Sequence, residues 1–157
     1  MAHFESSVVI SAPRHQVFEF HRKVQSFIKL MPDGVKAEPT APTTLFDKGV
    51  EFELRITSYG ISIVWSGVIE EFEGDVYFVD RQTDGPFTLW LHTHRFEDHG
   101  EGTLLTDIVE YDVPFGLFGK LADDLYIRSQ MARFFEIRHK KTKEIFEKIT
   151  ASSAGRS

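Results

Sequence analysis

Among its 157 residues the sequence has no cysteine, which excludes thiol catalysis, thiolate metal ligands and disulfide bonds. It also has no apolar run of about 18 residues, so we expect no transmembrane segment. The N-terminus lacks a basic segment followed by an apolar one, and we therefore predict no secretory signal and a cytoplasmic location. Positive charge is scarce as well: 18 Lys and Arg stand against 24 Asp and Glu, a net charge of −6, so nucleic acid is not an expected partner.

Aromatic side chains, in contrast, are abundant, with 15 Phe, 4 Tyr and 2 Trp. Each such ring can bury roughly 150–250 Å². A core of large flat groups packs to closure less easily than one of Leu and Val, and this composition points to an internal cavity. The chain length and the 41% content of hydrophobic residues fit one globular domain. We expect residues 1–157 to form it, with about 3–149 ordered and 150–157 as a tail.

The first part of the chain predicts a strand followed by two short helices. Residues 3–10 are typical of a strand, and Ser11 and Pro13 end it, because Ser can cap a helix and Pro suits its first turn. Apolar residues at helical spacing then predict one helix over about 14–23 and a second over about 24–30.

The rest of the chain predicts further strands and one long helix. Alternating apolar and polar residues indicate strands at about 51–56, 61–69, 76–82, 87–97 and 103–113. After an apolar loop at 114–119, apolar residues recur at helical spacing from about 121 to 149. The predicted order is a strand, two short helices, this series of strands and a long helix. Successive strands pair antiparallel, and the helix covers the apolar face of the sheet. The predicted fold class is therefore α+β, a curved antiparallel sheet of about seven strands wrapped around the C-terminal helix.

Short motifs occur along this order at residues 9–13 (VISAP), 16–18 (QVF), 84–87 (DGPF), 90–96 (WLHTHRF), 102–107 (GTLLTD) and 111–114 (YDVP). Together with the element order, they resemble the helix-grip fold of the START and birch-pollen-allergen superfamily (SRPBCC), above all its bacterial polyketide cyclase/dehydrase and coenzyme Q-binding-like branch. The resemblance covers about residues 3–147. It implies a cavity for a hydrophobic molecule without naming that molecule, because this fold hosts lipid carriers, polyketide aromatases, quinone chaperones and hormone receptors.

The most distinctive polar residues lie in the last two predicted strands. His92 and His94 are two positions apart and so share one face of the sheet. If Phe96 pairs with Thr103 across the turn, His92 lies opposite Asp107, and we predict a His92–Asp107 pair. An Asp beside a His fixes the tautomer of the imidazole and favours its protonated form. The pair could be a structural hydrogen bond, an anchor for a ligand or an acid–base pair. No third ligand for a metal is evident, so no metal site is predicted.

Other candidates for a ligand site lie on the same apolar faces as that pair or on the apolar stripe of the last helix. They are Phe52, Leu54, Trp65, Trp90, Tyr111, Met131, Phe134, Phe135 and Arg138. For each of them alone, packing in the core is the simpler interpretation, but some should line a cavity if one exists. Arg138 could bind an acidic group of a ligand or extend to solvent. The apolar residues Phe115, Leu117 and Phe118 could form a mouth that contacts a membrane transiently, or they could cap the core.

The sequence shows no nucleophile, metal cluster, phosphate-binding loop or cofactor motif, so we expect no cofactor. The leading hypothesis is a non-catalytic protein that binds or transports a hydrophobic small molecule, such as a lipid, a quinone or a polyketide-like compound. The alternative is a polyketide cyclase or aromatase that uses His92 and Asp107 for proton transfer. A third hypothesis is an accessory protein with a collapsed cavity. The identity of the ligand and the oligomeric state stay open.

Overall fold

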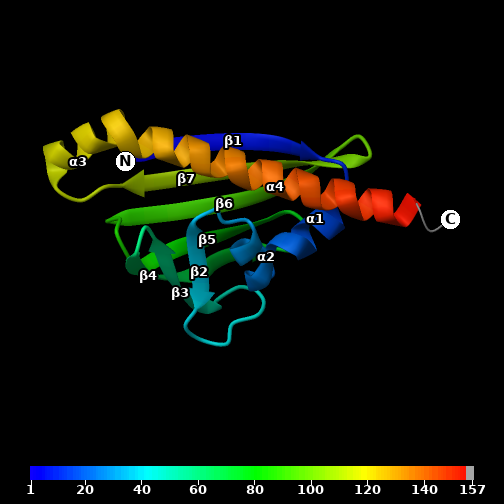
Figure 1. The fold of residues 1–157 in the computed structure, drawn as a ribbon, viewed down its shortest axis with the longest axis horizontal. Coiled ribbons are helices and arrows are strands. Elements are labelled where there is room, and N and C mark those ends of the chain that lie inside the picture. The colour runs from blue at the N-terminus through cyan, green and yellow to red at the C-terminus, as the bar shows by residue number, and fades with distance from the viewer. Residues whose placement is uncertain (155–157) are drawn as a thin grey trace.

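The computed structural model of the chain describes residues 1–154. Seven antiparallel strands form one curved sheet in the order β1-β7-β6-β5-β4-β3-β2, and a long helix lies along it (Figure 1). The strands are β1 (Ala2–Ile10), β2 (Val35–Pro39), β3 (Glu51–Ser58), β4 (Ile61–Glu73), β5 (Tyr77–Asp84), β6 (Leu89–His99) and β7 (Gly102–Asp112). The helices are α1 (Arg14–His21), α2 (Val24–Lys29), α3 (Gly116–Ala122) and α4 (Arg128–Ala154), with a π-helical turn, η1 (Asp123–Ile127), between the last two. The predicted α+β helix-grip architecture is confirmed.

The two edge strands of the sheet, β1 and β2, differ in how clearly the sequence indicates them. β1 pairs with β7 and forms one edge of the sheet. After β1, the helix cap predicted at Ser11 is wrong, because Pro13 takes the N-cap position of α1 and no side chain caps that helix. At the opposite edge, β2 lies where no alternation of apolar and polar residues indicates a strand. Pro39 can end it because an edge strand tolerates a missing N–H group.

The β6–β7 hairpin is paired two residues away from the predicted register. Phe96 lies opposite Leu105 and not opposite Thr103. The reason is the turn, which closes on the pair His99–Gly102 and is tighter than the loop that we predicted. Because side chains alternate with a period of two, this shift leaves every side chain on its predicted face.

The shift nevertheless changes which residues are direct neighbours across the two strands. His94, and not His92, lies opposite Asp107, and His92 lies opposite Val109. All of these side chains point to the concave face that α4 covers, so a diagonal contact between His92 and Asp107 stays within reach.

The C-terminal helical region begins at Gly116, before the predicted start near residue 121. Phe115 and Gly116 have φ angles of 73° and 54°, and this left-handed backbone reverses the chain after β7. The first turn then folds back so closely that a Cβ atom at Gly119 would lie 1.9 Å from the carbonyl oxygen of Pro114. Only glycine fits there. Most of the apolar segment predicted as a loop is therefore helix.

α4 forms the centre of the fold and runs beyond the predicted end near residue 149 to Ala154. The predicted tail is helical over 150–154, and residues 155–157 lie outside the described part of the chain. The buried residues of this helix are Met131, Phe135, Arg138, His139, Thr142 and Phe146. Ile149, which we predicted on the same stripe, is exposed. No helix within residues 1–154 is long and apolar enough to span a membrane.

The buried side chains form two apolar clusters along the concave face. The larger one is built around Phe18 of α1 and Phe78 and Phe96 of the sheet, whose rings are in mutual contact. The smaller one joins Tyr111 of β7 to Phe135 and its neighbours on α4. Members of both clusters line the cavity described next.

Candidate functional site

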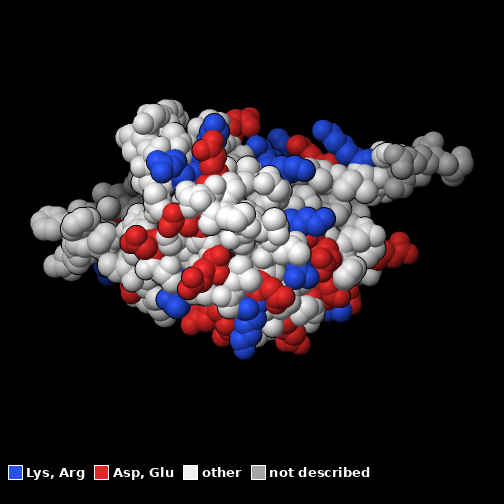
Figure 2. All heavy atoms as spheres, turned by 90° about the horizontal axis from the view of Figure 1, so that it is seen from below, with Lys and Arg blue, Asp and Glu red and all other residues white. Residues whose placement is uncertain are grey.

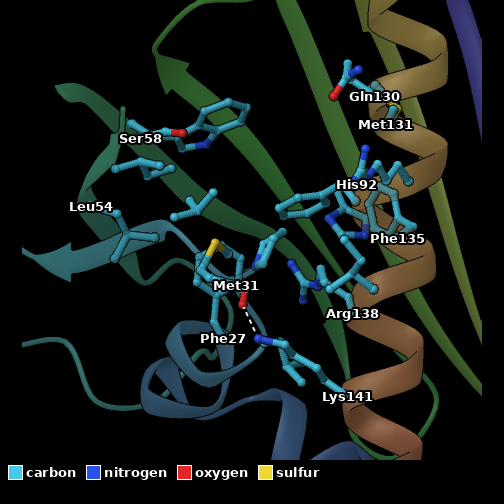
Figure 3. A pocket seen from close by; sticks show the side chains of 18 of the residues that line it. Phe27, Met31, Leu54, Ser58, His92, Gln130, Met131, Phe135, Arg138 and Lys141 are labelled. Carbon is cyan, nitrogen blue, oxygen red and sulfur yellow. Dashed lines mark hydrogen bonds between the residues drawn. The ribbon is translucent and has the colours of Figure 1, made fainter. Parts of the chain in front are cut away.

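A cavity of about 900 Å³ lies between the sheet and α4 (Figure 3). This volume falls in the range of roughly 300–1,000 Å³ that is typical of small-molecule pockets. Among the residues predicted to form a ligand site, the following line the cavity: Phe52, Leu54, Trp65, Trp90, His92, His94, Met131, Phe134, Phe135 and Arg138. The interior is therefore not collapsed. Most of its wall is aromatic or aliphatic, and the polar residues Asp80, His92, His94 and Arg138 lie where β5, β6 and α4 meet.

Two predicted site residues, Asp107 and Tyr111, are not part of this wall. Asp107 is buried behind His92, which lines the cavity, and its two carboxylate oxygens contact His92 and His139. Tyr111 is also buried, and its hydroxyl donates a hydrogen bond of 2.5 Å to Oδ1 of Asp123. Burial and this carboxylate raise the pKa of Tyr111 to about 12. Tyr111 therefore attaches the π-helical turn η1 to β7.

The cavity opens to solvent between the β3–β4 turn and the start of α4. Tyr59 and Ile63 on one side and Tyr126 on the other all line it and are all exposed. At the start of the C-terminal helical region, Phe115, Leu117 and Phe118 are more than four-fifths exposed. They do not cap the core, so that interpretation is wrong. On the face drawn in Figure 2, acidic and basic side chains are intermixed.

The polar end of the cavity is a buried hydrogen-bonded group that we call the histidine–aspartate cluster: Asp80, His92, His94, Asp107 and His139. Nε2 of His92 lies 2.7 Å from Oδ1 of Asp107, and Nε2 of His139 lies 2.5 Å from Oδ2 of the same carboxylate. Nε2 of His94 lies 2.6 Å from Oδ2 of Asp80. The His92–Asp107 contact predicted from the sequence is present, although it runs diagonally between the strands.

Aromatic stacking holds the two central imidazoles in place. The ring of His94 lies between those of Phe78, at a centroid distance of 4.2 Å, and His92, at 3.7 Å. Phe135 of α4 contacts the ring of His92 edge-on, 5.2 Å away. Sheet and helix together therefore fix the orientation of the rings.

The ionisation of the cluster follows from burial and from these hydrogen bonds. Burial alone would raise the pKa of Asp107, but the hydrogen bonds from His139 and His92 outweigh it and hold the pKa well below its ordinary value. Burial would also raise the pKa of Asp80, but the hydrogen bond from His94 and the charges of His92, His94 and Arg138 together outweigh it and lower this pKa. Burial, with the nearby charge of His92, lowers the pKa of His94 to about 4. At neutral pH the cluster thus contains two carboxylates and a neutral His94.

Arg138 of α4 also lies at this polar end. Its side chain is buried, and its guanidinium lies 4.9 Å from the ring centroid of Phe27 and 5.6 and 5.9 Å from those of Phe134 and Phe135. Burial lowers the pKa of Arg138, and the charges of Asp107 and Asp80 oppose that change. The alternative in which Arg138 extends to solvent is therefore wrong.

Three members of the cluster could offer ligand atoms to a metal. One such atom from each of Asp80, His92 and His94 lies within 4.8 Å of the others, and Asp80 is the third ligand that the sequence did not reveal. Oδ2 of Asp80, however, already accepts the hydrogen bond from His94, and the cationic Arg138 lines the same end of the cavity. A bound metal ion would have to break this hydrogen bond and would lie near the positive charge of Arg138. We therefore interpret these residues as a hydrogen-bonded cluster.

Sequence reasoning missed Asp80, His139 and His21 as members of this region. His139 follows Phe135 by one helical turn, and this spacing is a signal that could have placed it on the buried face. His21 lines the cavity, and its Nδ1 donates a hydrogen bond of 2.7 Å to the carbonyl oxygen of Val17. No local pattern distinguishes Asp80, because its partners belong to the neighbouring strand.

A curved antiparallel sheet that grips a long helix around an apolar cavity defines a helix-grip ligand-binding domain. Residues 10–135 match the family model described as "Polyketide cyclase / dehydrase and lipid transport", and the chain belongs to this family. No curated protein matches the chain in sequence. Family, fold and cavity together make this a protein with an internal site for a hydrophobic ligand.

Solved structures support the fold. A crystal structure of a protein from Thermus thermophilus is similar with a TM-score of 0.73 at 18% identity, over 94% of this chain and 99% of that one. A crystal structure of a protein from Chromobacterium violaceum is similar with a TM-score of 0.74 at 14% identity, over 92% of this chain and 96% of that one. The crystal structure of Ara h 8.0201 is similar with a TM-score of 0.61 at 10% identity, over 90% of this chain and 97% of that one.

Proposed function

We propose that the protein binds a hydrophobic small molecule of the lipid, quinone or polyketide-like type in its cavity and releases it unchanged. The observation that carries this proposal is the cavity of about 900 Å³ with a mostly aromatic and aliphatic wall. Burial of an apolar ligand against such a wall is favourable by roughly 25 cal/mol per Å² of apolar surface removed from water.

The hydrogen bonding of the polar end favours binding over catalysis. Both oxygens of Asp107 accept hydrogen bonds, from His92 and from His139, and Asp80 accepts one from His94. Each of these imidazoles therefore directs an N–H group at a carboxylate of the protein. The cluster is satisfied largely within itself, as expected of a rigid support for the cavity wall.

Native mass spectrometry of the freshly purified protein, followed by extraction with organic solvent, tests the proposal directly. We expect a co-purifying hydrophobic compound, and we expect the neutral probe N-phenyl-1-naphthylamine to bind and to be displaced by it. A protein that carries no compound and gives no fluorescence change with this probe would contradict the proposal.

Filling part of the cavity should weaken binding. Met131→Trp adds volume at a buried position of α4 that lines the cavity, and we expect the affinity for N-phenyl-1-naphthylamine to fall by at least about tenfold. The matched control is Ala132→Trp, an exposed position on the same helix, which should leave the affinity unchanged. Fluorescence titration measures both, and circular dichroism checks that both variants fold. Equal affinities in the two variants would place the probe elsewhere.

A second candidate function, a polyketide cyclase or dehydrase, is favoured by one observation. His94 lines the cavity, is neutral at physiological pH, and has a buried Nδ1 without a hydrogen-bond partner in the described residues. Nδ1 lies 3.5 Å from Oδ1 of Asp107, so the ring of His94 would have to turn toward the cavity before this nitrogen could accept a proton from a substrate. Incubation with a poly-β-ketone thioester, followed by mass spectrometry for loss of water, separates the two functions. Turnover that disappears in His94→Ala while binding is kept would favour the enzyme, and an unchanged substrate would favour the carrier.

A further inference from the structure

The guanidinium of Arg138 is a buried cation that the described protein does not neutralise by direct contact. Only 5% of the residue is exposed, and within residues 1–154 its guanidinium forms no hydrogen bond and no ion pair. An Arg side chain carries five N–H donors and stays charged at neutral pH. The nitrogens of Arg138 are not among the fully buried, unpartnered polar atoms of the described residues. They therefore face the open space of the cavity that Arg138 lines, where water or a ligand can accept their hydrogen bonds.

The surroundings of Arg138 explain how the fold tolerates this charge while the site is free of ligand. Three phenyl rings, those of Phe27, Phe134 and Phe135, lie within 4.9–5.9 Å of the guanidinium carbon and hold the side chain in one place. The carboxylates of Asp80 and Asp107 attract it over a longer distance, but both already accept hydrogen bonds from histidines. The rings cannot accept the five N–H groups in the way that an oxygen anion can.

The direction of the side chain shows where an acceptor would have to be. Arg138 leaves α4 toward the cavity and lines its wall together with Phe27 and Met31 of the opposite side (Figure 3). The nearby Lys141 is already partnered, because its Nζ donates hydrogen bonds of 2.6 Å to the carbonyl oxygen of Met31 and 3.1 Å to Oδ1 of Asp33. Of these two cations, Arg138 alone has its donors free.

We propose that Arg138 anchors an anionic oxygen group of the ligand, so that the ligand is an organic acid with a large apolar body, inserted with its acidic end at the polar end of the cavity. This inference rests on the proposed function and deepens it. A carboxylate suits the site best, because it accepts two parallel hydrogen bonds from one guanidinium. An ionised enol or phenol of a polyketide-like compound presents the same charge on one oxygen. The apolar body then lies against Trp65 and Trp90, toward the mouth.

A matched pair of probes tests the inference without any variant. Decanoate and methyl decanoate have the same chain and differ in the charge of one end. Competition against N-phenyl-1-naphthylamine at neutral pH should show that decanoate binds at least about tenfold more tightly, which corresponds to a charge-assisted hydrogen bond. Equal binding, or tighter binding of the ester, would overturn the inference.

Arg138→Met then identifies the group that makes the difference. Because Met keeps the apolar stem of Arg but not the guanidinium, the variant should lose the preference for decanoate and should bind the ester as well as the wild type does. Lys141→Met removes the neighbouring partnered cation and should keep the preference. If Arg138→Met weakens acid and ester equally, or if Lys141→Met loses the preference, Arg138 is not the anchor.

The two levels of the proposal fail in different ways. If neither decanoate, its ester nor the neutral probe binds, the proposed function is wrong and the inference falls with it. If the neutral probe and the ester bind but the acid has no advantage, the cavity binds hydrophobic molecules and only the role of Arg138 is refuted.

Discussion

Asp107→Ala is expected to lower the free energy of unfolding by about 3–5 kcal/mol, the range found when one partner of a buried charged pair is removed. The carboxylate is buried and accepts hydrogen bonds from two imidazoles that belong to different elements, His92 of β6 and His139 of α4. Its removal leaves two buried N–H groups without acceptors. It also removes one of the two negative charges that face the buried Arg138.

Urea denaturation followed by circular dichroism measures this loss, and two further variants identify its cause. Asp107→Asn keeps the volume and one acceptor oxygen, so its loss should be intermediate. Asp98→Asn removes an exposed carboxylate from the same hairpin, one that forms a 3.4 Å ion pair with Arg14, and should cost less than about 1 kcal/mol. If Asp107→Ala is as stable as Asp98→Asn, the cluster does not hold the helix to the sheet.

The fold could be predicted largely from local patterns, because its elements are signalled locally. Strands such as β3 and β7 alternate apolar and polar residues, and α4 keeps an apolar stripe, so both types of element are visible without tertiary contacts. β2 is the exception. Only Ala37 of its five residues is buried, so its pairing with β3 leaves almost no trace in the sequence.

The candidate site was predictable only where one element contributes several of its members. His92 and His94 stand out because they share a face of one strand. Asp80 joins them because β5 is paired with β6 so that Asp80 lies opposite His92, and that register is not visible in the sequence of either strand. His139 reaches Asp107 only through the way α4 lies across the sheet, and its place in a run of basic residues concealed its burial.

The register of the last hairpin shows why the prediction of a His92–Asp107 contact held although its premise was wrong. The turn is tighter than predicted, which moved the pairing by two residues and placed His94 opposite Asp107. A carboxylate in the middle of one face can contact both the opposite residue and its diagonal neighbour. An error of one residue would instead have placed the histidines on the convex face.

Acid should destabilise this protein strongly before its carboxylates titrate. Burial lowers the pKa of His21 to about 3, and burial with the charge of His92 lowers the pKa of His94 to about 4, both from an ordinary value of 6.5. Between these values and 6.5 the unfolded chain binds protons that the folded one does not. Stability is therefore fully present above about pH 6.5 and falls as the pH decreases, by roughly 2–3 kcal/mol for each histidine down to about pH 4.5.

The stability contributed by the carboxylates is lost at a lower pH than that contributed by the histidines, so the two effects can be measured separately. The folded pKa values of Asp80 and Asp107 lie below the ordinary 3.8, so the stability that they contribute is lost only as the pH falls below that value. Of the charged and titratable groups around His21, Asp107 raises its pKa while Arg138 and His94 lower it, and burial outweighs all three.

His21→Gln isolates one of the two histidines. A Gln side chain can still donate a hydrogen bond to the carbonyl oxygen of Val17, but it binds no proton in the unfolded chain. Urea denaturation at about pH 6.5 and about pH 4.5 should show that the variant loses roughly 2–3 kcal/mol less than the wild type over this interval. His99→Gln, at an exposed position of the β6–β7 turn, should lose as much as the wild type. A His21→Gln variant with the acid sensitivity of the wild type would mean that His21 takes up its proton in the folded state, and that the polar end of the cavity is more open to water than its packing indicates.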